Sequence, residues 1–206
     1  AMLLLTVTRG ELLAAWQKAT PPDAPNRFVI NIQPDQRQAV ADLLAADGIA
    51  AELSPMVRGR LMQIGDHPVS AASYPDDERA QRLIEREFNL SWRAALPPGN
   101  RVSAGRWFAP EDVGKGLASI EEGLARTLGI EPGDELLFVI GGQETRVRVS
   151  SLRKLDWDSM RVNFFVLTPP GVLDDAPASY ITSFHLATDQ TAVGQALVAR
   201  FPNLTL

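Results

Sequence analysis

Residues 119–152 read SIEEGLARTLGIEPGDELLFVIGGQETRVRVSSL, and this stretch predicts a helix followed by a β-hairpin. Ser119 is expected to cap a helix that continues to Leu128, because Glu122, three residues after the serine, completes a capping box. Gly129 is expected to end this helix, since glycine adopts the left-handed backbone of a helix C-terminus without steric cost. The segment therefore predicts one short helix with defined ends.

The hairpin is predicted from two adjacent glycines, Gly141 and Gly142. Paired glycines suit a two-residue turn, whose backbone requires positive φ angles, and β-type runs flank them over 136–140 and 144–152. Proline and glycine at 169–171 separate two further β-type runs, which cover residues 160–167 and 179–186.

The first third of the chain predicts a β-α-β unit. Residues 27–33 form a short β-type run, and Asp35 with Gln38 is expected to open a helix that ends at Gly48. A long strand, bent near a proline or glycine, is expected over 51–64. A β-β-α unit near the end of the chain, with its helix over 189–201, would pair with this unit in one α+β layer.

These units predict an α+β fold of two lobes. Residues 27–86 and 156–206 would form an outer lobe, and residues 87–155 would form an inserted lobe that is richer in strands. Residues 1–26 contain an apolar opening that ends in a proline-rich break, and two interpretations stay open. The opening is either an amphipathic helix that packs on the domain or the last turns of a membrane helix.

The amino-acid composition excludes several classes of function. The 206 residues carry 20 Lys+Arg and 25 Asp+Glu, a net charge of −5 that argues against a nucleic-acid-binding protein. Hydrophobic residues make up 45% and charged residues 22%, a balance typical of a globular protein. The absence of cysteine excludes a thiol nucleophile, a disulfide framework and a Cys-ligated zinc site.

The residue patterns point to no catalytic residue, no cofactor-binding residue and no metal ligand. Ser183 and His185 would lie on one face of a strand, but no G-x-S-x-G elbow accompanies them, so a stand-alone periplasmic serine hydrolase is only the alternative. The glycines at 114–116 lack the spacing of a phosphate-binding loop. The paired carboxylates are more typical of caps at turns and helix starts, and they occupy positions 76–77, 121–122 and 174–175.

Aromatic residues near the predicted strand ends allow two interpretations. They either pack in the core and between the lobes, or they form a surface for a partner or a lipid. They are Trp92, Trp107, Phe108, Trp157, Phe164 and Phe165.

Four stretches resemble FtsX-like ABC transporter permeases, and specifically their YbbP-like group. Residues 21–36 (PPDAPNRFVINIQPDQ) resemble the start of the extracytoplasmic domain in that group, and residues 96–108 (LPPGNRVSAGRWF) resemble a later part of it. The helix and hairpin that begin at Ser119 and the run over 157–186 resemble further parts. Together these stretches cover a little under half of the chain.

The resemblance implies a MacB-like periplasmic core domain of a bacterial inner-membrane permease. Its outer lobe would be of the porter type, its inserted lobe of the sabre type, and residues 1–26 would be the end of the first membrane helix and a linker. It implies mechanical coupling without catalysis and without a cofactor, with ATP hydrolysed by a separate cytoplasmic ABC ATPase subunit. A hydrophobic or acylated cargo and a periplasmic thioesterase/lysophospholipase partner are also implied.

Overall fold

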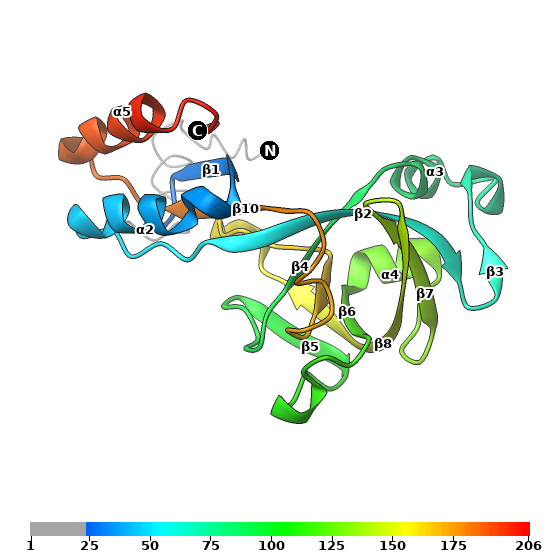
Figure 1. Ribbon diagram of the computed structural model, residues 1–206. Coiled ribbons are helices and arrows are strands. Elements are labelled where there is room, and N and C mark those ends of the chain that lie inside the picture. The colour runs from blue at the N-terminus through cyan, green and yellow to red at the C-terminus, as the bar shows by residue number, and fades with distance from the viewer. Residues whose placement is uncertain (1–23) are drawn as a thin grey trace, which may run out of the picture.

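The computed structural model describes residues 24–206, so the predicted end of a membrane helix falls almost entirely outside the described residues. Within residues 24–206, no helix is long and apolar enough to cross a membrane. Figure 1 shows two groups of elements, with α2 (Arg37–Ala46) and α5 (Thr191–Arg200) at one end of the molecule and α3 (Glu78–Glu85) at the other.

Strands dominate the described part of the chain. A short helix, α4 (Glu122–Leu128), follows the sixth strand. The strands are β1 (Arg27–Ile32), β2 (Ser54–Ile64), β3 (His67–Pro68), β4 (Phe88–Trp92), β5 (Asn100–Gly105), β6 (Leu117–Glu121), β7 (Glu135–Ile140), β8 (Gln143–Leu155), β9 (Val166–Thr168) and β10 (Ala178–Phe184).

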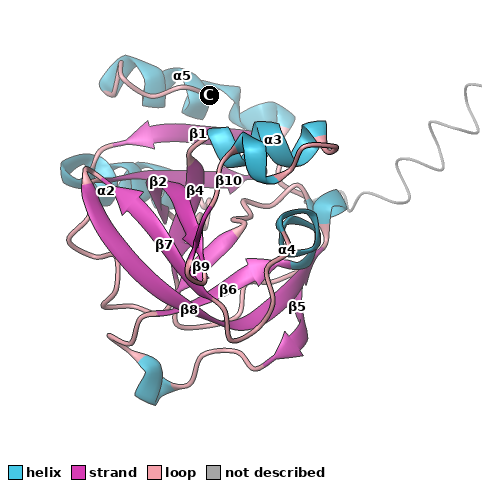
Figure 2. Cartoon of the chain, turned by 90° about the vertical axis from the view of Figure 1, so that its right-hand side faces the viewer, coloured by secondary structure: helices cyan, strands magenta, loops and turns pink. Residues whose placement is uncertain are grey.

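Six of these strands close into a ring. In order around the ring they are β2, β4, β9, β6, β8 and β7, and β7 pairs back with β2. Figure 2 shows these strands curving around a common interior. Because alternate residues of a strand point to opposite faces, one apolar face of each strand fills this interior. We call it the ring core, and its buried members include Val57, Leu61, Leu90, Ile120, Leu136, Phe138, Val147, Val149 and Val166.

A second core lies under α2 and α5. The strands β1, β10 and β2 form an antiparallel sheet, and the two helices contribute their apolar faces to it. We call this cluster the terminal core, and it comprises Val29, Ile32, Val40, Leu44, Ile49, Phe184, Leu186, Val193, Leu197, Phe201 and Leu204.

Strands β2 and β10 join the two cores. Residues Ser54–Val57 of β2 pair with Ile181–Ala178 of β10, and beyond Val57 the same strand pairs with β4 and β7. The two buried cores meet near residues 54 and 178, whereas the lobe bounds at 87 and 155 stay a prediction. Residues 54–86 and much of 156–177, predicted for the outer lobe, contribute Ala80, Ile84 and Leu173 to the ring core. The two-lobe organisation itself stays a prediction.

Many local predictions are confirmed. The strand over 27–33, the hairpin, and the strand over 179–186 are all present, and both hairpin glycines have positive φ angles of 56° and 80°. The helix predicted over 189–201 is confirmed as one 3₁₀ turn followed by α5. Gly129 ends α4 with a φ of 77°, in the left-handed region, as expected.

Other local predictions are wrong. Ser119 does not cap α4 because it lies within β6, and the Glu121 carboxylate instead accepts hydrogen bonds from the amides of Gly123 and Leu124. The strand predicted over 160–167 is confined to 166–168, since Met160 is left-handed with a φ of 57°. Asp35 caps no α-helix, because a single 3₁₀ turn over Pro34–Gln36 precedes α2.

The predicted β-β-α unit also differs from the structure. β9 belongs to the ring, where it pairs with β4 and β6, and only β10 and α5 join the terminal core. The overall class is α+β, with a large mixed sheet and few helices.

Candidate functional site

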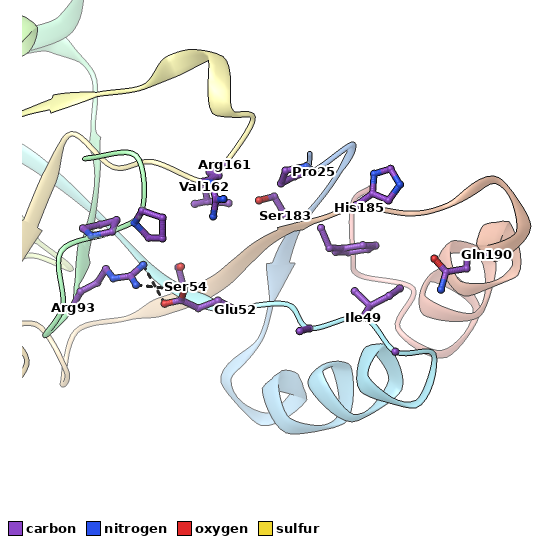
Figure 3. A pocket seen from close by; sticks show the side chains of 15 residues that line it. Pro25, Ile49, Glu52, Ser54, Arg93, Arg161, Val162, Ser183, His185 and Gln190 are labelled. Carbon is purple, nitrogen blue, oxygen red and sulfur yellow. Dashed lines mark hydrogen bonds and ion pairs between the residues drawn. The ribbon is translucent and has the colours of Figure 1, made fainter. Parts of the chain in front are cut away.

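A cleft of about 670 Å³ lies where the two cores meet. Figure 3 shows its side chains, with Arg93, Arg161 and Val162 on one side and Ile49, Ser183 and His185 on the other. Its lining comprises Pro25, Gly48, Ile49, Ala50, Glu52, Ser54, Arg93, Pro97, Pro98, Arg161, Val162, Ser183, Phe184, His185 and Gln190.

Segments that are far apart in the sequence build the two walls. The connection from α2 to β2 and the end of β10 contribute the wall on the side of the terminal core. The chain that follows β4, with Pro97 and Pro98, and the turn before β9 contribute the other wall. Because the terminal core supplies one wall and segments that flank the ring strands β4 and β9 supply the other, the shape of the cleft depends on how these parts are placed relative to each other.

Among the described residues that line the cleft, one ion pair connects the two walls. Arg93 Nη1 lies 3.1 Å from Glu52 Oε1, and Arg93 Nη2 donates to Glu52 Oε2 at 3.4 Å. The Glu52 carbonyl accepts a hydrogen bond of 2.8 Å from Thr182 Oγ1, so the glutamate is anchored to β10 as well. The Glu52 side chain is 64% exposed and that of Arg93 is 23% exposed, and a pair with such access to solvent stabilises a structure by only about 0.2–1 kcal/mol.

The structure does not support the serine hydrolase alternative. Ser183 and His185 both line the cleft, but no hydrogen bond joins them in the described part of the chain. His185 Nδ1 lies 2.9 Å from the Ala24 carbonyl oxygen, which can only accept, so we assign the proton to Nδ1. Among the described residues that line the cleft, Glu52 is the single one with a carboxylate side chain, and this carboxylate forms an ion pair with Arg93. A nucleophile–base–acid relay is therefore not assembled.

The cleft is locally basic in an acidic protein. Two arginines and one glutamate line it, which leaves a formal charge of +1, whereas the whole chain carries −5. The Arg161 backbone is held by its amide, which donates to Ser159 Oγ at 3.3 Å, and by its carbonyl, which accepts from Asn163 Nδ2 at 3.3 Å. Within residues 24–206, no hydrogen bond or ion pair engages the Arg161 guanidinium.

A buried arginine, Arg153, lies in the wall of the ring and not in the cleft. It is fully buried, and its Nε donates to Ser119 Oγ at 2.9 Å while Nη2 donates to the Phe164 carbonyl at 2.8 Å. Nη1 donates to Asn100 Oδ1 at 2.5 Å. Burial lowers the pKa of Arg153 to about 10, and the negative charge of Glu121 partly offsets this effect. The guanidinium therefore remains charged at neutral pH and ties β5, β6 and the segment before β9 to β8.

A second charged group, Asp112, organises the loop after β5. Its side chain is 2% exposed, accepts a hydrogen bond of 2.9 Å from Arg106 Nη1, and accepts another from the Ala109 amide at 2.8 Å. These hydrogen bonds, that of Arg106 above all, lower the pKa of Asp112 to about 2. Asp112 thus fixes a loop and does not line the cleft.

The sequence analysis singled out neither Arg153 nor Asp112. For Arg153 a signal was present, because Val147, Val149, Ser151 and Leu155 occupy the inward positions of β8, and Arg153 continues that alternation. No comparable pattern marks Asp112. The paired carboxylates act at chain turns: the Asp77 carboxylate accepts from the Ala80 amide at 3.0 Å, and that of Asp174 accepts from Gly171 at 2.9 Å.

Most of the aromatic residues pack. Phe108 and Phe164 are buried in a small third cluster with Leu167, and Trp107 packs against this cluster. Trp157 is the exception, because it is 55% exposed and only its ring stacks at 5.7 Å from that of Phe165. Among residues 24–206, no group of three or more histidine and acidic side chains is arranged to hold a metal ion.

Comparison with known proteins confirms the resemblance to the YbbP-like permeases. No model of a known protein family matches the chain. The whole chain is 39% identical over 206 residues to the uncharacterized ABC transporter permease YbbP of Escherichia coli (strain K12), and it spans 24% of the length of that relative. A solved domain assigned to a permease protein of Porphyromonas gingivalis is 14% identical, with a TM-score of 0.41, and the match covers 86% of this chain and 85% of that domain.

Proposed function

Because all 206 residues match part of an ABC transporter permease, we propose that the chain is the periplasmic domain of a permease subunit in a bacterial inner membrane. In this proposal it is a MacB-like domain with a porter-like and a sabre-like lobe. It couples movement of the membrane helices, driven by a cytoplasmic ABC ATPase, to the extraction or export of a hydrophobic or acylated cargo.

The observation that carries this proposal is the connection between the two cores. Two strands, β2 and β10, join them, and the exposed Arg93–Glu52 pair bridges the cleft beside these strands. A weak ion pair and two continuous strands allow one core to tilt against the other at small energetic cost. Each core keeps its own apolar interior during such a movement.

The terminal core brings β1 and residues 203–205 together. Ile30 forms an antiparallel bridge with Thr205, and the Asn31 Nδ2 group donates to the Asn203 carbonyl at 2.9 Å. The first strand and the last residues therefore lie side by side. Movement of neighbouring membrane helices would act on one core at this point.

The partner and cargo assignments belong to the same proposal. ATP hydrolysis is assigned to a separate ABC ATPase subunit, and the domain itself is assigned no catalytic residue. A periplasmic thioesterase/lysophospholipase is the proposed partner on the periplasmic side. Co-purification of that enzyme with the assembled permease, and its loss when this segment is deleted, is the expected result.

Spin-label distances test the coupling directly. The 206 residues contain no cysteine, so a pair of labels can be introduced within them at Gln38→Cys on α2 and Arg82→Cys on α3, both of which are exposed. The permease, assembled with its ATPase in lipid, is measured with and without ATP. We expect the distance between these labels to change with the nucleotide.

A matched pair within one core provides the control. Arg82→Cys and Arg126→Cys lie on α3 and α4, which contact each other, so this distance should stay constant. An unchanged distance between positions 38 and 82 in every nucleotide state would contradict the proposed coupling.

A further inference from the structure

We infer that the cleft between the two cores binds a small organic anion with an apolar tail, and that Arg161 binds the anionic group. This inference rests on the cleft alone and holds whether or not the domain couples movement in a transporter.

Charge selects an anion. The lining carries a formal charge of +1 in a chain of net charge −5, so the cleft departs in sign from the protein as a whole. Because Arg93 is paired with Glu52, Arg161 carries the excess positive charge, and a positive charge in a concave site attracts anions. Arginine suits this role because its planar fork donates two parallel hydrogen bonds to a carboxylate or a phosphate.

Arg161 is a better anion-binding residue than Arg93. The Arg93 guanidinium already bonds both oxygens of Glu52, and its Nε donates to the Ala95 carbonyl at 3.1 Å. No described group engages the Arg161 guanidinium, whereas its backbone is held by two hydrogen bonds. The left-handed backbone of Met160, just before it, defines the turn that brings Arg161 to the cleft.

Apolar side chains from both walls of the cleft accompany the charge. Ile49 and Phe184 belong to the terminal core, Val162 packs against the third cluster, and Pro97 and Pro98 complete the opposite wall. Ligand sites typically combine such an apolar lining with a few polar groups that fix orientation. An apolar tail next to the anionic group therefore matches the lining.

Size favours a small molecule over a protein. A volume of about 670 Å³ is within the range of roughly 300–1,000 Å³ that is usual for small-molecule sites. A stable protein interface would instead need about 800 Å² on each partner.

Octanoate is the probe, because it joins a carboxylate to a short apolar tail. It is titrated into the 206-residue chain and followed by amide chemical shifts, with 1-octanol as the uncharged analogue and inorganic phosphate as the anion without a tail. We expect saturable octanoate binding with shifts at Ile49, Val162 and Ser183. Arg161→Gln should weaken it about tenfold or more, because a hydrogen bond to a charged group is lost.

A matched variant controls for general charge. Arg82→Gln removes an exposed arginine from α3, at the other end of the molecule from α2 and α5 in Figure 1, and should leave octanoate binding unchanged. Circular dichroism confirms that both variants are folded.

Four results would overturn the inference. They are no octanoate binding at about 10 mM, equal binding by the Arg161→Gln variant, equal binding of 1-octanol, or equal binding of phosphate. None of them bears on the spin-label experiment, and a constant label distance would leave the binding result intact. The two proposals therefore fail separately.

Discussion

Replacing Arg153 tests whether the cost of burying its charge or the loss of its hydrogen bonds has the larger effect on stability in the wall of the ring. Burial lowers the pKa of Arg153 from its usual value to about 10, which corresponds to a penalty of roughly 3 kcal/mol on the buried charge. Arg153→Met removes this penalty and keeps a similar length. It also leaves the Phe164 carbonyl and Asn100 Oδ1 without their arginine donor, at about 1–3 kcal/mol each. Ser119 Oγ keeps its hydrogen bond of 2.7 Å from Ser151, so it is not orphaned.

Arg153→Lys should therefore be the more damaging change, although it is chemically closer. Lysine retains the buried charge but lacks the fork that reaches Ser119, Asn100 and Phe164 together. Its unsatisfied charge should lower the free energy of unfolding by about 3–5 kcal/mol. For Arg153→Met, the opposing effects above sum to between a gain of about 1 kcal/mol and a loss of about 3 kcal/mol.

Urea unfolding at pH 7, followed by tryptophan fluorescence and circular dichroism, measures these differences. Lys154→Met is the matched control, because Lys154 is exposed on the same strand and should change stability by less than about 0.5 kcal/mol. If the lysine variant is as stable as the methionine variant, burial of the charge does not dominate at this position and the reasoning is refuted.

Three further predictions concern the loop, the cleft and the sheet edge. Because the pKa of Asp112 is lowered from 3.8 to about 2, the carboxylate stabilises the fold fully above pH 4 and loses this effect as the pH falls towards 2. The difference in unfolding free energy between the protein and the Asp112→Asn variant should therefore shrink over that interval, and a constant difference would argue against the lowered pKa. A double-mutant cycle of Glu52→Gln and Arg93→Gln, measured by unfolding, should give a coupling free energy of about 0.2–1 kcal/mol that disappears in 1 M salt. A coupling free energy that persists in 1 M salt would show that the ion pair is not exposed to solvent. Gly105→Ala should lower the free energy of unfolding by more than about 2 kcal/mol, because Gly105 has a φ of 73° and the new Cβ would collide with the Ser150 carbonyl. Gly133→Ala is the control, because open space surrounds its Cβ and only the backbone strain of about 1 kcal/mol remains. Equal losses of stability in thermal unfolding would exclude the collision.

Local chemistry made the elements predictable. Gly141 and Gly142 require a turn that only positive φ angles satisfy. Alternation of apolar residues marks β1 and β8, and a continuous apolar run marks β7, whatever their partners are. Gly129 similarly ends α4 through its own backbone freedom. The caps were less predictable, because Ser119 and Glu121 both suit a helix start. Strand pairing with β8 and β9 draws Ser119 into the sheet.

Long-range pairing decided the rest. The apolar side chains of α3, Ala80 and Ile84, pack into the ring core and not into the terminal core, and neighbouring residues alone do not determine that choice. β2 reads as one strand, and only the folded chain shows that its first residues pair with β10 and its later residues with β4 and β7.

The sequence by itself thus determined the turns, the strand periods and the resemblance to the YbbP-like permeases, since each depends on neighbouring residues or on matched stretches of chain. Only the tertiary structure decided the closed ring, the placement of the two cores, the contacts of Arg153 and the cleft. The physical reason is that strand edges and buried charges are satisfied by groups far away along the chain, as when Arg153 binds Asn100, Ser119 and Phe164 at once.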